Sequence, residues 1–382
     1  MRVKLAIVSL LIASLVGCSS NDKKELKEAP LIKFSATAKA RKNWSATIGS
    51  GRDKRYSKLV PAVFSDRVYA SDVEGNVYAL NLDSGKRVWK SRLKESISAS
   101  TGVNSHSVFV GTFSGELIAL SADNGEEKWR VSVSSEILAV PAANERVVVA
   151  QTIDGRAFAF DADSGEALWR YDHTVPSLTL RGTANPVIYR NQVLLAFGNG
   201  QLVSLQLSDG ALKWDARLSQ PKGRTELEKM IDIDATPFFS GGLIYAANYQ
   251  GAIAAYSAAQ GQAVWKQDLS TYQDLSVANG KVYAVTEESA VIAFNAGSGV
   301  QDWMNDQMLR RMLGAPAAYG DYVLTLDYEG YMHVLSADDG SFAARFKPAG
   351  DDFTSAIVVS DSAFLVLSDD GRLSSYTLQT LN

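Results

Sequence analysis

A repeat of about 40 residues that ends in tryptophan constrains this chain more than any other feature. Its clearest copy is the run DVEGNVYALNLDSGKRVW, and each of the next two copies ends 40 residues further along. The copies end at Trp89, Trp129, Trp169, Trp214, Trp265 and Trp303, while the seventh has Phe346 in that place and the eighth stops earlier. Units of this size stack on one another, because one alone buries too little apolar surface. We expect each tryptophan to dock between neighbouring units.

Each copy contains two tight turns around a short strand. In the first copy, Gly75 and Gly85 follow polar or acidic residues, a composition typical of hairpin turns that need positive φ. The alternating run at residues 77–80 indicates a strand with one packed face. Two further short strands, at residues 59–64 and 67–71, precede this copy. Four short antiparallel strands per unit are typical of β-propeller blades.

The tryptophan count indicates how the ring closes. Six of the seven tryptophans end a repeat, and Trp44 alone stands before the first copy, without strands of its own. Because the eighth copy lacks its last strand, we expect residues 41–48 to supply it and to pair the two chain ends. The sequence therefore predicts an all-β fold, an eight-bladed propeller of four-stranded antiparallel blades. Seven blades is the alternative, since Ser289 stands where the sixth copy should have glycine.

Length and charge fit one domain of this kind. A propeller over residues 41–382 accounts for most of the 382 residues, and a content of 46% hydrophobic and 21% charged residues is ordinary for a globular fold. Of 38 basic and 42 acidic residues, 36 basic ones remain after Arg2 and Lys4 are removed with a leader, so the net charge becomes −6. This balance offers no electrostatic footprint for nucleic acid.

The N-terminus predicts an exported, lipid-anchored protein. Residues 1–17 carry two basic residues and then an apolar run too short to span a bilayer comfortably, as secretory leaders do. The run ends in LVGC, which resembles a bacterial lipobox, so we expect Cys18, the only cysteine, to carry acyl chains such as palmitate. Residues 18–40 are charged and lack a strand pattern, which predicts a flexible tether. By the same resemblance, Ser19 favours the outer membrane over the inner one.

Two insertions mark where a binding site would lie. The spacing between tryptophans grows to 45 residues before Trp214 and to 51 before Trp265. Both insertions join the last strand of one blade to the first strand of the next, so we expect them to emerge on one face of the ring. A third irregular connection, MNDQMLRRMLGAP, follows Trp303 and should open on that face too. The first three repeats are so regular that their connections leave little room for a site.

The residues within the insertions fit a protein-docking surface. The first insertion offers Leu178, Leu180 and Arg181, and the second offers Asp232 and Asp234. Arginine and large apolar side chains tend to dominate the energetics of protein interfaces. The alternative is structural: the two leucines fill the inside of the ring, and Arg181 pairs with one of the aspartates. Composition alone leaves both interpretations open.

The repeat G-x-(L/V)-x-A-(L/F)-(D/N/S)-x-x-x-G-x-x-x-W resembles the Trp-docking repeat of the quinoprotein propellers. With the lipobox, the loop VPSLTLRG and the segment DIDATP, the whole chain more specifically resembles the propeller lipoproteins of the β-barrel assembly machine in Gram-negative outer membranes. The resemblance implies an eight-bladed, non-enzymatic scaffold that is lipid-anchored to the outer membrane and faces the periplasm.

This resemblance also implies partners and contact residues. Scaffolds of this family bind the periplasmic POTRA domains of BamA and help to deliver or orient unfolded outer-membrane proteins. Carried over by motif, the contacts with BamA fall on Leu178, Leu180, Arg181, Asp232 and Asp234. The third connection and Phe346 depart from the family pattern, which leaves contacts and packing there open.

Two other classes of protein share such a repeat. A quinoprotein dehydrogenase would hold pyrroloquinoline quinone and a metal in its channel, and Asp232 and Asp234 offer oxygen donors that suit Ca²⁺. Many of those enzymes have a vicinal cysteine pair, which this sequence lacks. The three histidines lie in different repeats without zinc-site spacing, so we expect no catalytic residue, metal or cofactor. A generic envelope-binding propeller, for example for carbohydrate, would expose aromatic residues, whereas these insertions offer aliphatic residues, methionine and arginine.

Overall fold

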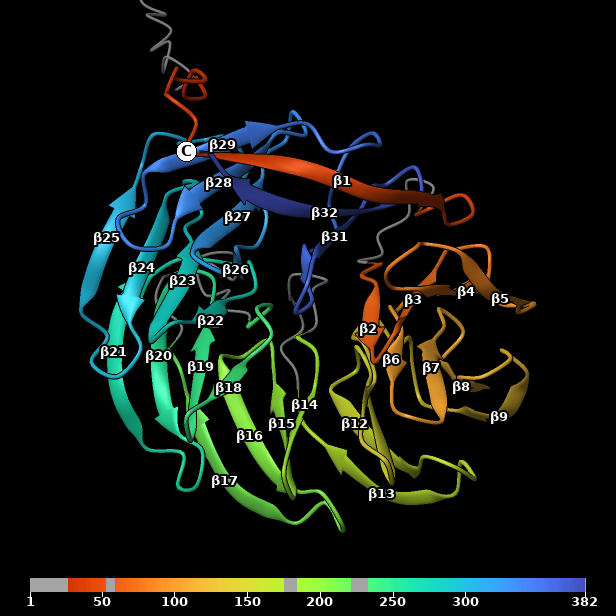
Figure 1. The fold of residues 1–382 in the computed structure, drawn as a ribbon. Coiled ribbons are helices and arrows are strands. Elements are labelled where there is room, and N and C mark those ends of the chain that lie inside the picture. The colour runs from red at the N-terminus through yellow and green to blue at the C-terminus, as the bar shows by residue number, and fades with distance from the viewer. Residues whose placement is uncertain (1–26, 53–58, 175–183, 221–232, 382) are drawn as a thin grey trace, which may run out of the picture.

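The computed structural model describes residues 27–52, 59–174, 184–220 and 233–381. Over these ranges the regular elements are 32 strands, which form eight antiparallel sheets of four strands each. Figure 1 shows the sheets as blades around a central axis, with the first and last strands side by side. The predicted all-β, eight-bladed propeller is therefore confirmed. Among the described residues, no helix has the length and apolar content needed to cross a membrane.

The strands of each blade run in chain order from the central channel outward, except in the last blade. Blades one to four contain β2 (Ala62–Phe64), β3 (Arg67–Ser71), β4 (Asn76–Asn81) and β5 (Arg87–Arg92); β6 (Gly102–Val103), β7 (Ser107–Gly111), β8 (Glu116–Ser121) and β9 (Glu127–Ser132); β10 (Ala142–Ala143), β11 (Val147–Gln151), β12 (Arg156–Asp161) and β13 (Ala167–Asp172); β14 (Val187–Tyr189), β15 (Gln192–Ala196), β16 (Gln201–Gln206) and β17 (Leu212–Arg217).

The second half of the ring repeats this order, and its last blade combines both ends of the chain. Blades five to eight contain β18 (Phe238–Ser240), β19 (Leu243–Ala247), β20 (Gly251–Ser257) and β21 (Ala263–Leu269); β22 (Ser276–Ala278), β23 (Lys281–Val285), β24 (Val291–Asn295) and β25 (Gln301–Asn305); β26 (Ala317–Tyr319), β27 (Tyr322–Leu326), β28 (Met332–Ser336) and β29 (Phe342–Phe346); β30 (Val358–Val359), β31 (Phe364–Leu367), β32 (Arg372–Thr380) and β1 (Ala38–Thr47).

The blade that raised the seven-blade alternative forms normally. Ser289 lies in the turn between β23 and β24 and has a φ of 68°, the left-handed conformation that Gly75 takes in blade one with a φ of 92°. The N–H of Ser289 donates to the carbonyl of Thr286 at 2.8 Å. A serine in this region of φ carries some strain, but the turn still closes.

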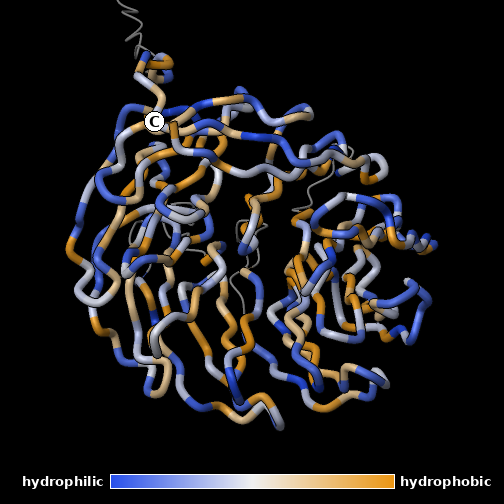
Figure 2. The backbone as a smooth tube through the Cα atoms, viewed as in Figure 1, coloured by the Kyte–Doolittle hydropathy of each residue, from blue (hydrophilic) through white to orange (hydrophobic). Residues whose placement is uncertain are grey.

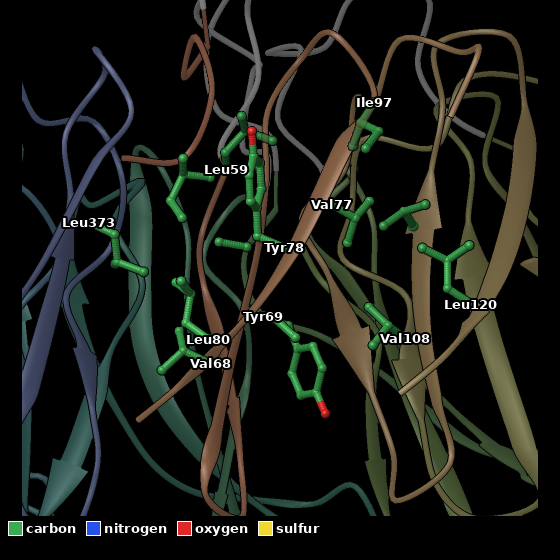
Figure 3. Packing of buried hydrophobic residues seen from close by; sticks show 14 of the residues in the cluster. Leu59, Val68, Tyr69, Val77, Tyr78, Leu80, Ile97, Val108, Leu120 and Leu373 are labelled. Carbon is green, nitrogen blue, oxygen red and sulfur yellow. The ribbon is translucent and has the colours of Figure 1, made fainter. Parts of the chain in front are cut away.

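The middle strands of each blade form the core, because both of their faces pack against neighbouring blades. Every residue of β7 is buried, as are the four central residues of β8. Figure 3 shows this packing on both faces of blade one, where Val68 and Leu80 lie toward Leu373 and Val77 lies toward Val108. Figure 2 shows that apolar residues concentrate on these inner strands and polar ones on the outer turns.

The tryptophans join each blade except the seventh to the next, as predicted. The indole N–H of Trp89 on β5 donates to the carbonyl of Ala122 in blade two at 2.9 Å. Its ring covers Gly125, where an added Cβ would come within 2.5 Å of a ring atom, and Gly125 has a φ of 77°. Glycine is required there on both counts. All seven tryptophans make the equivalent hydrogen bond to the next blade.

The residue that replaces tryptophan in blade seven is Ala344, and the prediction of Phe346 for this place was wrong. Ala344 pairs with Val334, which is the register position that Trp129 takes opposite Ala119. A tryptophan there would have no turn to dock on, because the third and fourth strands of blade eight come from opposite ends of the chain. Phe346 instead packs on Tyr376 of β32, with ring centroids 5.4 Å apart.

The two chain ends close the ring through β1 and β32, as predicted. The pairing runs from Ala38 opposite Thr380 to Thr47 opposite Arg372, with an irregularity between Lys42 and Trp44. Trp44 docks on blade one like the other tryptophans. The strand therefore begins at Ala38, slightly before the predicted residues 41–48.

Residues 27–37, which we call the N-terminal strap, lie against blade seven. The sequence predicts a flexible tether as far as residue 40, but Ile32 and Phe34 pack on the core between blades six and seven. The Phe34 ring stacks on Phe342 of β29 with centroids 5.2 Å apart. Figure 1 shows this stretch in red outside the ring, beside the start of β1. Apolar side chains amid the charged run explain why this part of the chain packs.

Candidate partner-docking face

One face of the propeller, which we call the loop face, carries the connections from each outer strand to the next inner strand. The turns between the second and third strands of each blade lie on the same face, because strands alternate in direction within a blade. The insertions singled out in the sequence belong to the connections after β13 and after β17. Their predicted emergence on one face therefore follows from the observed topology.

The loop face is hollowed at the mouth of the central channel. This hollow has a volume of about 660 Å³. Its apolar lining comes from Leu138, Val140, Met312, Phe353 and Ile357. Its lining also includes the carboxylates of Asp234, Asp274 and Glu287. A concave apolar site with a few polar groups is the usual form of a binding site.

Hydrogen bonds between successive connections hold the wall of this hollow. The N–H of Val140 donates to Asn185 Oδ1 at 2.7 Å, and Asn185 Nδ2 donates to Thr236 Oγ1 at 3.0 Å. The N–H of Thr236 donates in turn to Asp274 Oδ1 at 2.6 Å. These four residues come from four consecutive connections. The wall is thus fixed by side chains rather than by strand pairing alone.

Asp234 is the predicted contact residue that the structure describes. Asp234 is 7% exposed and lines the hollow. Its neighbours Ile233 and Ala235 are 2% and 0% exposed. Because the main chain is packed on both sides of it, Asp234 has a defined position at the channel mouth.

The other predicted site residues lie outside the described residues. They are Cys18, Leu178, Leu180, Arg181 and Asp232. The described ends of the two inserted connections do reach the loop face, since Asn185 and Asp234 both line the hollow. Contact of BamA with these residues stays a prediction.

The third connection, residues 306–316, divides between core and surface. Met308 and Leu313 are each 1% exposed and belong to the core between blades six and seven. Met312 is 64% exposed and lines the hollow. The sequence predicts only that this connection opens on the loop face, and the structure leaves part of it available to a partner.

Arg311 of this connection is buried in a charged network of blade seven. Its guanidinium is paired with Asp327 at 2.7 Å and with Glu329. Burial alone would raise the pKa of Asp327, but hydrogen bonds from His333, from the Tyr331 N–H and from Arg311 hold it below its usual value. Paired in this way, the charges bind one another rather than a ligand.

The histidines occupy separate places, as their spacing predicts. His106 lies in the turn before β7, His173 follows β13, and His333 lies on β28. The His173 ring stacks on Phe197 with centroids 4.1 Å apart, and burial lowers its pKa. In the part of the chain that the structure describes, no three histidine, cysteine or acidic side chains gather as metal ligands do.

Several lining residues were missed by sequence reasoning. Leu138 and Val140 belong to a connection of the regular repeats, for which the sequence predicts no site, and Phe353 belongs to the connection between β29 and β30, which the sequence did not single out. The available signal was topological: every connection on the loop face reaches the channel mouth, whatever its length. A large apolar residue just before an inner strand is therefore a candidate in each blade.

These features define the class of the protein: a Trp-docked, eight-bladed propeller of the quinoprotein type. A solved quinohemoprotein alcohol dehydrogenase from Comamonas testosteroni is similar with a TM-score of 0.70 and 14% identity, over 88% of this chain and 76% of that chain. Identity this low shows a shared fold alone.

Relatives with higher sequence identity identify the family within this class. The family model described as "Outer membrane protein assembly factor BamB" matches residues 73–305. The outer membrane protein assembly factor BamB of Pseudomonas aeruginosa is 43% identical, over 98% of this chain and 99% of that protein. The crystal structure of BamB from Moraxella catarrhalis is similar with a TM-score of 0.81 and 26% identity, over 88% of this chain and 99% of that chain. This chain belongs to the BamB family.

Proposed function

We propose that the protein is a non-enzymatic scaffold subunit of the outer-membrane β-barrel assembly machine. In this proposal its loop face docks on the periplasmic POTRA domains of BamA and assists the folding and insertion of outer-membrane proteins. Acyl chains on Cys18 anchor it to the outer membrane on the periplasmic side. Membership of the BamB family supports the assembly role.

The observation that carries the docking site is the fixed position of Asp234 at an apolar hollow. Residues 233 and 235 are buried on either side, and Asp234 lines the hollow together with Met312 and Phe353, which come from other connections. A rigid apolar site with a few charges suits a protein partner, because its residues lose little conformational entropy on binding. Both inserted connections contribute to this site: Asn185 comes from the connection after β13 and Asp234 from the connection after β17.

A binding titration tests the docking site. Purified BamA periplasmic domains are titrated calorimetrically into the protein as wild type and as Leu180→Ala with Arg181→Ala. We expect the double variant to lose at least about tenfold in affinity, roughly 1.4 kcal/mol. The control is Asp83→Ala, an exposed residue in the turn between β4 and β5 on the opposite face.

A thermal melt of each variant shows whether it is folded. No binding by the folded wild type, or equal loss in Asp83→Ala, would contradict docking through the loop face. The same protein, mixed with pyrroloquinoline quinone and Ca²⁺, tests the enzyme alternative. We expect no shift of its melting temperature in that mixture.

A further inference from the structure

The upstream end of the N-terminal strap lies at the loop face. Arg310 Nε donates to the carbonyl of Lys27 at 2.6 Å, and the N–H of Ala29 donates to the carbonyl of Leu309 at 2.9 Å. Leu309 and Arg310 belong to the third connection, whose Met312 lines the hollow. The chain therefore reaches the propeller beside the candidate docking site.

The downstream end of the strap lies near the opposite face. The N–H of Thr37 donates to the carbonyl of Ala343 at 2.9 Å, and the carbonyl of Thr37 accepts from the N–H of Leu381 at 2.8 Å. Ala343 is the second residue of β29, directly after the turn that joins β28 to β29. That turn lies on the face opposite the loop face, so the strap crosses the full outer edge of blade seven.

Charged and aromatic contacts hold the strap between these two ends. Arg345 Nη1 donates to the carbonyl of Ile32 at 2.8 Å, and Arg311 Nη1 donates to the carbonyl of Ala29 at 3.1 Å. The Arg345 guanidinium also lies 5.1 Å from the ring centroids of Phe34 and Phe342. Charge-assisted bonds at several carbonyls favour one path for the main chain.

We infer that the strap routes the membrane anchor to the loop face and thereby holds that face near the lipid surface. This inference rests on the proposed lipidation of Cys18. Nine residue steps separate Cys18 from Lys27, which span at most about 30 Å. If the strap were released, 20 steps would separate Cys18 from Ala38 on the opposite face, a reach of about 70 Å. The strap thus determines which face of the propeller lies near the lipid anchor and how far that face can lie from the anchor.

The consequence concerns the geometry of docking. A partner that is itself embedded in the membrane would meet the loop face within a short distance of the lipid surface. Confinement of this kind raises the effective concentration of one site near the other without any new contact. The strap would act as a spacer as well as a part of the fold.

Energy transfer on vesicles measures which face lies near the membrane. The full-length lipidated protein is bound to vesicles of phosphatidylethanolamine and phosphatidylglycerol that contain acceptor-labelled headgroups. Because Cys18 is the only cysteine and its thiol would be acylated, one introduced cysteine takes the donor dye. The two positions are Met312→Cys on the loop face and Asp338→Cys in the turn before β29, and both residues are exposed. We expect transfer to be several-fold more efficient from position 312.

A strap-release variant tests the cause. Ile32→Ser with Phe34→Ser removes the two apolar contacts of the strap, and Lys33→Ser changes the exposed residue between them as a matched control. In the release variant we expect the difference between the two label positions to shrink, and hydrogen exchange at the Ala29 and Thr37 amides to rise at least about tenfold. The control should keep both properties.

The outcomes separate this inference from the proposed function. Flotation with the vesicles reports the anchor: a protein that does not float refutes lipid anchoring, and the inference falls with it. A protein that floats with equal transfer from both positions, or with greater transfer from position 338, overturns the routing while the anchor stands. The routing would also be overturned if the release variant showed faster hydrogen exchange in the strap but kept the difference in transfer between the two label positions. Another feature would then set the orientation.

Discussion

The indole N–H of Trp44 donates to the carbonyl of Leu82 at 2.8 Å and joins the first strand of the chain to blade one. Trp44 lies on β1, the outer strand of blade eight, and its ring covers Gly85, where an added Cβ would come within 2.4 Å. Elsewhere this contact joins blades that follow one another in the chain. Here it closes the ring, so the stability of the whole propeller depends on a residue near the N-terminus.

Substitution of Trp44 should therefore destabilise the ring as much as substitution of an internal tryptophan. We expect Trp44→Ala to lower the free energy of unfolding by about 3–5 kcal/mol, through loss of a large buried side chain and the cavity that it leaves. Val88→Ala, at a site 47% exposed on β5, should change it by less than about 0.5 kcal/mol. Urea unfolding of the two variants checks this. Similar values for both would show that closure does not depend on Trp44.

A pair of glycines separates backbone strain from interblade packing. Gly125 and Gly242 have φ of 77° and 81°, but a Cβ on Gly125 would meet the Trp89 ring at 2.5 Å, whereas Gly242 has nothing within 4 Å. We expect Gly242→Ala to cost about 1 kcal/mol from φ alone. Gly125→Ala should cost about 1–3 kcal/mol more, because the tryptophan must move. Equal unfolding midpoints for the two variants would contradict this account of blade docking.

The blade number and the closure could be predicted because each tryptophan reports one blade-to-blade contact. Trp44 stands without strands of its own and the last repeat lacks an outer strand, which together imply pairing of the chain ends. The residue that replaces tryptophan in blade seven could not be read correctly, since Phe346 is aromatic and lies nearby. Strand register identifies Ala344 instead. The repeat pattern of the sequence shows which residues make up a blade. The register of two strands, in contrast, is known only once the paired strand is identified.

The candidate site was less predictable, because it combines residues from connections that are distant in sequence. The pattern located the two insertions, and Asp234 does lie at the channel mouth. It gave no signal for Leu138 or Phe353, which reach the same hollow from connections without a marked insertion. It also assigned the N-terminal strap to a tether, since the contacts of Phe34 are made by Phe342 and Arg345 some 300 residues later. Long-range packing of this kind leaves no local period.

Asp274 should control the rigidity of the hollow. Asp274→Ala leaves the partly buried Thr236 N–H without its acceptor, and an unpaired donor of this kind costs about 1 kcal/mol locally. We expect faster hydrogen exchange at Thr236 and a several-fold weaker affinity for BamA periplasmic domains. Asp83→Ala, on the opposite face, should change neither quantity. Unchanged exchange at Thr236 in Asp274→Ala would show that other contacts hold this wall.

His333 connects the charged network of blade seven to the strap. Arg345 Nε donates to His333 Nδ1 at 3.2 Å, and His333 Nε2 lies 2.9 Å from Asp327 Oδ2. One ring nitrogen thus accepts while the other donates, as only the neutral imidazole does. Burial lowers the pKa of His333, and this effect outweighs the opposing hydrogen bond with Asp327. Protonation of His333 would turn Nδ1 into a donor that faces the Arg345 N–H, so Arg345 would lose its acceptor. The Nε2–H would still donate to Asp327.

Acidification should therefore weaken both the fold and the strap. Because the pKa of His333 is lower in the folded state than the unfolded value of about 6.5, the unfolded chain takes up this proton first as the pH falls. We expect the His333 contribution to be full above that value and to decline below it, by at most about 1.4 kcal/mol per pH unit for one proton. Urea midpoints between about pH 5.5 and 8 check this for the wild type and for His333→Gln.

The glutamine variant isolates this histidine from His173, whose pKa burial also lowers. His333→Gln should show a shallower decline than the wild type over that range, since one proton-binding group is gone. The protection factor of the Thr37 amide, which corrects for the slower intrinsic exchange at lower pH, should fall on acidification in the wild type, as Arg345 shifts and releases the Ile32 carbonyl. Parallel pH profiles for the two proteins would rule out His333 as the titrating group. A protection factor at Thr37 that stays constant would show that the network does not control the strap.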